Sequence, residues 1–318
     1  LLLSPGSGSV RVDSNVIRGN LAGAGDGGGI QLLSVNGEDA TSNNTNNWHS
    51  VDIVNNMINN NVAGLAGGGI AMQDALRVTI QNNTVAHNET TATTALAFAP
   101  GAPNQSNPTP AGIVARTHST DLALELGLVF SDPPVISDSI IEHNRSFYWL
   151  NFDDPATPAI ETGLFPANCV APPAGAGCDV TGIGYDPAAH SADLAVMDGP
   201  FTVDAVYELT AQFSLLTGDM VDTDFVNAYF NGARNNEDIT EFTTIQTAGA
   251  FDEGGNFIQV SFGPLSLIDS TGELLDYHIV AGAAALDAGD SANTLSVDID
   301  DDLRPQGAGF DIGADEAQ

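Results

Sequence analysis

A repeated pattern of apolar residues and asparagines constrains the fold of this chain most. The fullest copy, Val51 to Ile70, reads VDIVNNMINNNVAGLAGGGI. Two apolar residues at alternate positions are followed by an Asn pair, another apolar residue, a further Asn and a glycine run that ends in Ile. The first half of the chain holds four copies, the last of them degraded, and their second apolar segments contain Ile17, Ile58, Val85 and Ile141. Self-similarity of this kind indicates a fold built from stacked units.

Each repeat predicts short strands joined by tight corners. Alternating apolar residues are typical of a strand that buries one face. Asn tolerates left-handed backbone angles, so the Asn pairs and the glycines suit sharp corners. We expect three strands and three corners per repeat, with the third strands beginning at Ile30, Ile70 and Ile113. A disordered Asn/Gly-rich segment is the alternative, but it would not keep apolar and polar positions in register.

One turn of such a coil cannot bury its apolar face alone, so the turns must stack with equivalent strands paired in parallel. We expect Ile17, Ile58 and Val85 to form one inward-facing file, and the equivalent Asn residues to form ladders. The pattern resembles the right-handed parallel β-helix of pectin-lyase-like proteins. The predicted fold class is therefore all-β, a right-handed parallel β-helix (solenoid) with an irregular, loop-rich C-terminal region.

Three regions are expected along the chain. Residues 1–150 would form the coils with loop insertions, and residues 151–275 an irregular β-rich continuation. That continuation contains Cys169 and Cys178, whose close spacing predicts one short-range disulfide of the kind found in secreted proteins. Residues 276–318 would form a closing segment. Because the chain starts at Leu1 without Met or a signal peptide, we expect a fragment or processed product, whose open solenoid end could contact a protein partner or another copy.

The last fifty residues carry a second pattern, DYHIVAGAAALDAGDSA followed by DIDDDLRPQGAGFDIGADE. This stretch resembles the choice-of-anchor Q type domain that ends some bacterial secreted β-helix proteins, although Asp301 stands where that pattern has Gly. The resemblance implies a secreted or cell-surface bacterial protein.

Charge limits the class of partner. The chain has a formal net charge of −34 from 41 acidic residues and seven Arg, without Lys. Such a surface repels phosphate backbones, so we expect no nucleic-acid partner. No stretch has the length and hydropathy of a membrane span, and neither a nucleotide fingerprint nor a haem-attachment motif is present.

The acidic run near the C-terminus is the candidate metal site. Asp298, Asp300, Asp301 and Asp302 place four carboxylates within five residues. Hard cations such as Ca²⁺ take six to eight oxygen ligands, so Ca²⁺ is the candidate cofactor. The competing interpretation is a solvated acidic turn in which Asp298 or Asp311 pairs with Arg304.

Candidate catalytic and binding residues are sparse. The resemblance to pectin-lyase-like solenoids implies a polysaccharide lyase as one possible activity. Its candidate base is Arg145, the only candidate with neighbouring acid-base groups, which are Glu142 and His143. Loop insertions supply Trp48, His49, Phe98 and His118 as candidates for a groove wall that contacts carbohydrate or protein, or as residues that merely shield the core.

These observations favour a non-catalytic secreted or cell-surface solenoid with a structural, adhesive or assembly role. A carbohydrate-active enzyme of the polysaccharide-lyase type is the first alternative. A sheath or assembly subunit of an extracellular filament is the second.

Overall fold

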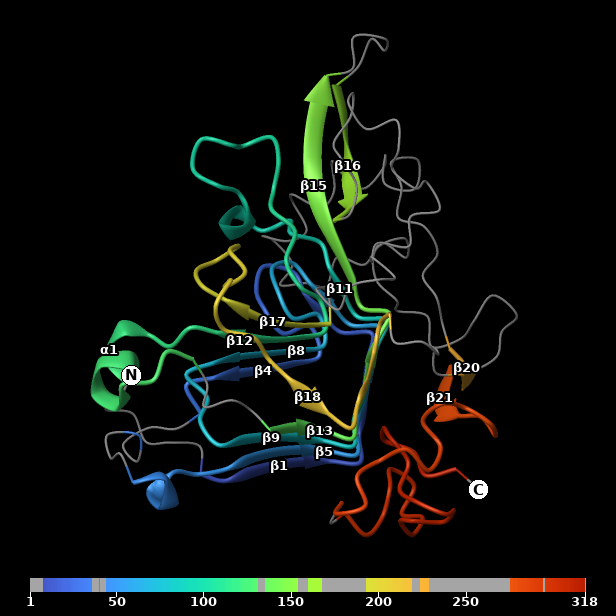
Figure 1. Cartoon of the computed structure of the whole chain (residues 1–318). Coiled ribbons are helices and arrows are strands. Elements are labelled where there is room, and N and C mark those ends of the chain that lie inside the picture. The colour runs from blue at the N-terminus through green and yellow to red at the C-terminus, as the bar shows by residue number, and fades with distance from the viewer. Residues whose placement is uncertain are drawn as a thin grey trace.

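The computed structural model describes residues 8–35, 40, 44–130, 135–153, 160–167, 193–218, 224–228, 275–293 and 295–317. Over these residues the chain forms a right-handed parallel β-helix, which confirms the predicted fold class (Figure 1). One short α-helix, α1 (Thr120–Leu126), lies in a loop outside the coils. None of the described helices has the length and apolar character required to cross a membrane.

Each turn of the coil contributes four short strands. The first turn consists of β1 (Val10–Asp13), β2 (Val16–Arg18), β3 (Leu21–Ala22) and β4 (Ile30–Leu33). The second consists of β5 (Val51–Val54), β6 (Met57–Asn59), β7 (Val62–Ala63) and β8 (Ile70–Gln73). The third consists of β9 (Val78–Gln81), β10 (Thr84–Ala86), β11 (Glu89–Thr90) and β12 (Ile113–Arg116). The fourth consists of β13 (Val135–Ser137), β14 (Ile140–Glu142), β15 (Arg145–Asp153) and β17 (Leu194–Met197).

Strands in equivalent positions pair in parallel and build four sheets along the coil axis. In one sheet Ile17 pairs with Ile58, Ile58 with Val85, and Val85 with Ile141. The side chains of the last three are fully buried, and Ile17 packs against the same core. The predicted inward-facing file is therefore confirmed.

The expectation of three strands per turn is wrong, because a fourth, two-residue strand lies between the second apolar segment and the glycine run. It appears as β3, β7 and β11, which pair with one another. Glu89 and Thr90 in the third turn carry no apolar alternation. A two-residue strand whose side chains differ in polarity from turn to turn leaves no period-2 signal in the sequence.

The Asn-rich corners behave as predicted. The first residue of each Asn pair adopts a left-handed backbone conformation, with φ of 54° at Asn55 and 51° at Asn82. The second residue points inward and joins a ladder: the backbone N–H of Asn56 donates to the side-chain oxygen of Asn83 at 3.0 Å. A second ladder runs through the other corner, from Asn20 through Asn61, Asn88 and Asn144 to Asp193.

The glycine run is required by close packing between turns. A Cβ atom added to Gly68 would lie 2.4 Å from the Glu89 carbonyl oxygen of the next turn, and Gly67 has a φ of 63°. A side chain at either position would force the turns apart or strain the backbone.

The coil continues beyond Asn144, where the repeat fades in the sequence. β17 completes the fourth turn, and a partial fifth turn holds β18 (Ala211–Gln212) and β19 (Leu215–Leu216). β15 extends out of the stack and pairs antiparallel with β16 (Ile160–Pro166) as a projecting hairpin (Figure 1). Phe147, Tyr148 and Trp149 belong to this hairpin, where Phe147 packs on Leu164.

The C-terminal segment lies along the side of the coils (Figure 1). Its strand β21 (Asp276–Ile279) pairs antiparallel with β20 (Phe225–Asn227). Tyr277 packs against Met57 and Ala86 on the outer face of β6 and β10. Further along, the Asn55 side chain donates to the Val297 carbonyl at 3.0 Å, and the Asp138 carbonyl accepts from the Gly313 N–H at 2.8 Å. The segment thus spans several turns along one corner.

Candidate functional site

The acidic residues of the C-terminal segment bond mainly to backbone amides of the same segment. Asp298 is buried, and its carboxylate accepts from the N–H groups of Asp300 and Asp302 at 2.9 Å and of Glu316 at 3.0 Å. Arg304 and Glu316 form an ion pair of 2.9 Å in which both side chains are fully buried. The acidic motif and the terminal motif therefore interlock into one small unit.

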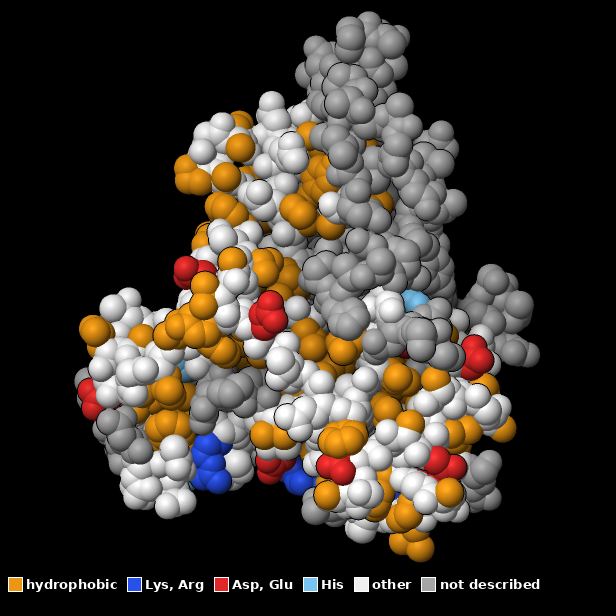
Figure 2. Space-filling view, viewed as in Figure 1, with side chains coloured by type: hydrophobic (Ala, Val, Ile, Leu, Met, Phe, Trp, Pro, Cys, Tyr) orange, Lys and Arg blue, Asp and Glu red, His pale blue; other side chains and the backbone are white. Residues whose placement is uncertain are grey.

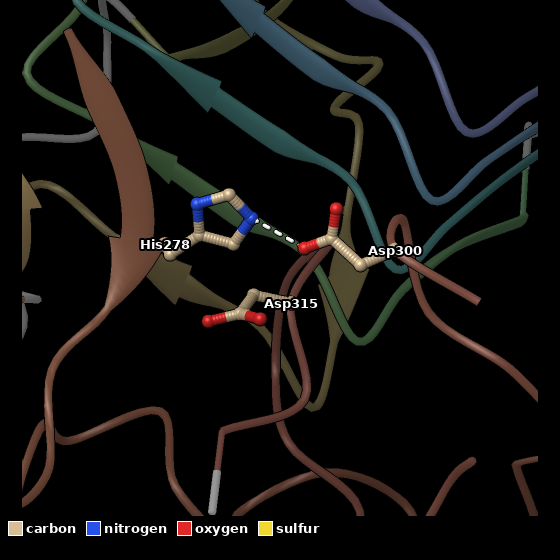
Figure 3. Close-up of side chains that lie close together, drawn as sticks. All are labelled: His278, Asp300 and Asp315. Carbon is tan, nitrogen blue, oxygen red and sulfur yellow. Dashed lines mark hydrogen bonds and ion pairs between the residues drawn. The ribbon is translucent and has the colours of Figure 1, made fainter. Parts of the chain in front are cut away.

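A mixed histidine–carboxylate cluster lies on the surface of this unit and is the candidate metal centre. His278 comes from β21, Asp300 from the acidic turn and Asp315 from the C-terminal tail, and one ligand atom of each lies within 4.8 Å of the others. The His278 Nε2 atom is 2.7 Å from the Asp300 Oδ2 atom. In Figure 3 the imidazole ring faces Asp300, with the Asp315 carboxylate beside the gap between them.

A third acidic residue, Asp276, orients the imidazole. Asp276, two residues before His278 on the same strand, bonds to the His278 Nδ1 atom and also accepts from the His278 N–H at 3.0 Å. This contact turns the Nε2 atom toward Asp300. Asp315 is 7% exposed and accepts from the Ile279 N–H at 2.9 Å through its Oδ2 atom.

Burial and charge act in opposite directions on these groups. Burial disfavours the imidazolium, but the bond to Asp276 and the neighbouring carboxylates outweigh it, so the pKa of His278 is raised. Burial raises the pKa of Asp315, although the Ile279 N–H and His278 act in the opposite direction. The cluster therefore holds a proton or a cation more readily than its separate groups would.

The structure brings only one of the four predicted calcium ligands into this cluster. Asp300 belongs to it, whereas Asp298 is engaged by backbone amides and Asp301 and Asp302 are exposed. The sequence did not indicate His278 or Asp315, because His278 lies 22 residues before Asp300 and the turn geometry that joins them is not periodic. The Tyr-His pair ahead of an acidic run is the only sequence signal for the histidine.

Arg145, the candidate base, is 1% exposed and forms a buried ion pair with Glu89 of the preceding turn. Its guanidinium also lies 5.3 Å from the centre of the Phe147 ring. Glu142 is buried, and its carboxylate is 3.8 Å from the Nδ1 atom of His143. His143 occupies a corner with a φ of 55° and stacks on His87 at 5.4 Å. The three residues are neighbours, and their described contacts support the coil.

The four candidate groove residues do not form one wall. Trp48 is 5% exposed and packs with Leu76 and Leu122 beneath a loop. His118 is also buried, with its Nδ1 atom 3.2 Å from an Asp74 carboxylate oxygen. Phe98 packs against a separate apolar cluster, and His49 is exposed. Burial of Trp48 and His118 favours the shielding role that the sequence left open for these loops.

A cavity of about 310 Å³ lies against β12 and β17 and is lined by Leu65, Met197 and Pro200. Its one basic group, Arg116, makes a two-pronged ion pair with Asp26, with N–O distances of 2.6 and 2.7 Å. The guanidinium also donates to the Gly199 carbonyl at 2.6 Å. The Arg116 guanidinium is therefore committed to these partners, and the cavity wall also includes the polar side chains of Gln73 and Thr117.

The remaining sequence predictions concern the surface and the cysteines. On the face of the molecule that Figure 2 shows, the acidic side chains of the described residues are scattered rather than gathered in one patch. Cys169 and Cys178 lie outside the described residues, so the predicted disulfide stays a prediction.

Comparison of the chain with protein-family models, with curated proteins and with solved structures finds no match.

Proposed function

We propose that this chain is a non-catalytic solenoid that works at the cell surface or outside the cell as a structural, adhesive or assembly subunit. One observation carries the proposal: the basic groups best placed to act on a substrate are already used to hold the structure together. Arg145, Arg116 and Arg304 each form an ion pair with a carboxylate and are each less than a tenth exposed.

The resemblance at the C-terminus supports the proposed setting. The acidic, Arg-Pro and terminal Asp-Ile-Gly motifs, which resemble the choice-of-anchor Q type domain, contact one another in the fold. A segment of this kind in a pectin-lyase-like solenoid agrees with a bacterial secreted protein, and Ca²⁺ at the acidic turn remains a proposed cofactor. The carbohydrate or protein that the coils would contact is part of the same proposal.

The first turn supports a role in assembly. In the part of the chain that the structure describes, β1, β2, β3 and β4 are each the edge strand of their sheet. Edge strands offer unpaired backbone groups on which a further chain can add a strand. A filament subunit is therefore the second candidate function.

The decisive experiment separates scaffold from lyase. The purified chain is incubated with uronate polymers, with and without Ca²⁺, and the formation of unsaturated sugar is followed by absorbance. We expect no product. Product that disappears in Arg145→Ala and persists in Arg11→Ala, whose side chain is 49% exposed, would establish the lyase instead. Electron micrographs of the concentrated chain test assembly, for which end-to-end association is the expected result.

A further inference from the structure

We propose that His278, Asp300 and Asp315 form a binding site for a divalent transition metal ion, best suited to Zn²⁺, that joins three separate parts of the C-terminal segment. The proposal is independent of the scaffold function. It rests on the geometry of the cluster, on the orientation of its histidine and on its excess of negative charge.

The geometry places three donors from three distant segments around one point. All three ligand atoms lie within 4.8 Å of one another, and the separation from His278 Nε2 to Asp300 Oδ2 is 2.7 Å. In a tetrahedral zinc site, metal–ligand distances of about 2.0–2.2 Å place the ligands about 3.3–3.6 Å apart. Small side-chain rotations therefore suffice to form the site, with a fourth position left for water.

The contact of Asp276 with the far side of the ring is an independent feature. Histidine ligands of metals commonly use one ring nitrogen for the metal and give the other N–H to a carboxylate, which fixes the tautomer and the ring orientation. His278 has this arrangement: Asp276 bonds to Nδ1 and leaves Nε2 facing Asp300 and Asp315.

Charge favours a bound cation. The unit places six carboxylates, Asp276, Asp298, Asp300, Asp311, Asp315 and Glu316, around two basic side chains, His278 and Arg304. Arg304 is committed to Glu316 at 2.9 Å. Asp315, only 7% exposed, accepts from the Ile279 N–H through its Oδ2 atom and also offers a carboxylate oxygen to the cluster. Burying carboxylates in excess of cations is costly, and a divalent ion would offset this cost.

The donor set selects the class of ion. Imidazole together with carboxylates suits Zn²⁺ and related transition metals, whereas Ca²⁺ prefers six to eight oxygen ligands. The site therefore differs from the proposed calcium site in the acidic turn. The two share only Asp300, which makes them separable by mutation.

Titration calorimetry of the chelator-treated full chain with Zn²⁺ tests the proposal. We expect one ion per chain and a rise in Tm. His278→Gln and Asp300→Asn should each weaken binding at least about 100-fold, and Asp276→Asn about 10- to 100-fold because it only orients the ring. Asp301→Asn is the matched control, since Asp301 is exposed, has a left-handed φ of 68° that Asn tolerates, and belongs to the same turn.

Replacement of Zn²⁺ by Co²⁺ provides a spectroscopic readout, because a tetrahedral Co²⁺ site with an imidazole ligand has strong visible absorption that aqueous Co²⁺ lacks. We expect this absorption in the wild type and in Asp301→Asn, but not in His278→Gln. Absence of Zn²⁺ binding, or equal binding by His278→Gln, would overturn the proposal. So would Ca²⁺ binding that displaces Zn²⁺ and is lost in Asp301→Asn, since the acidic turn would then be the cation site.

Discussion

The coils and the C-terminal segment are stabilised by different kinds of contact. In the second and third turns, core positions are filled by Ile53, Ile58, Ile80 and Val85, all fully buried and stacked on identical or similar residues of neighbouring turns. In the segment 276–318, the described strand is only four residues long, and much of the buried contact is made by Asp298, Arg304 and Glu316. The coils repeat the same few core contacts in successive turns, whereas each contact in the C-terminal segment occurs only once.

This difference determines which parts of the chain a destabilising substitution should affect. In a solenoid each turn contacts only its neighbours, so a lost core contact weakens the turns on both sides. The C-terminal segment contacts the outside of the coils, so it can detach while the coils remain folded. Local hydrogen exchange distinguishes these outcomes better than a single unfolding curve, because repeat proteins need not unfold in one step.

The largest effect is expected for Arg304→Gln. The substitution leaves the Glu316 carboxylate buried without its guanidinium partner, and removal of one member of a buried ion pair costs about 3–5 kcal/mol. We expect faster exchange at residues 311–317, with little change in β6 and β10. Arg11→Gln, which breaks an exposed pair with Asp13, is the control and should cost less than about 1 kcal/mol. Equal loss of protection in the coils would show that the segment and the coils are one cooperative unit.

Ile58→Ala should have the next largest effect, and in the other region. Ile58 is fully buried between Ile17 and Val85 in the central file, and truncation of such a side chain costs about 2–5 kcal/mol. Exchange should accelerate in β2, β6 and β10, which is measurable by mass spectrometry. Val16→Ala, at a side chain that is 54% exposed in the first turn, is the control. If the two variants were equally stable, the stacked file would not be the main support of the coils.

The same contrast explains what the sequence could predict. The file at Ile58 and the corner at Asn55 occur in every turn, so each copy reinforces the others, and both were predicted. The fourth strand was missed because Val62–Ala63 in one turn is replaced by Glu89–Thr90 in the next, with backbone pairing as the only shared feature. In the metal cluster, His278 and Asp315 meet through folding of the C-terminal segment, and no repeat indicates their contact. Asp300 alone was predicted, because its carboxylate neighbours lie beside it in the sequence.

Asn88→Ala tests the polar part of the coils. The Asn88 side-chain oxygen accepts from the Asn61 N–H at 3.0 Å, and its amide donates to the Ile58 carbonyl at 2.9 Å. Each buried group left unpaired costs about 1–3 kcal/mol, so we expect a total loss of about 3 kcal/mol. Asn20→Ala removes the exposed end of the same ladder and should cost less than half as much. Urea unfolding compares the two, and similar costs would mean that the ladder's position in the core is unimportant.

The last prediction is the pH dependence of Asp193, which ends the Asn ladder and whose effect is spread over about two pH units. Its carboxylate is fully buried and accepts from the Asn144 amide at 3.0 Å and the Thr217 N–H at 2.8 Å. Burial raises the pKa of Asp193 to about 6. Between about pH 4 and pH 6 the unfolded chain loses this proton while the folded chain keeps it, so the free energy of unfolding falls as pH rises. This contribution is fully present below pH 4 and is lost through pH 6, and at 1.36 kcal/mol per pKa unit it amounts to about 3 kcal/mol.

Asp193→Asn stays neutral throughout this range, so its unfolding free energy should fall less steeply than that of the wild type between pH 4 and pH 6. Urea unfolding at intervals of half a pH unit measures the slope, and Asp302→Asn, at an exposed residue of the C-terminal segment, is the control. Burial also raises the pKa of Asp311 to about 6, in the C-terminal segment. Asp311→Asn should therefore change the pH dependence of exchange in residues 285–289 and 311–317 and leave β17 unchanged. Asp193 immediately precedes β17 and makes no contact with Asp311 among the described bonds. If Asp311→Asn changed the pH dependence of exchange in β17, the coils and the C-terminal segment would therefore lose stability together.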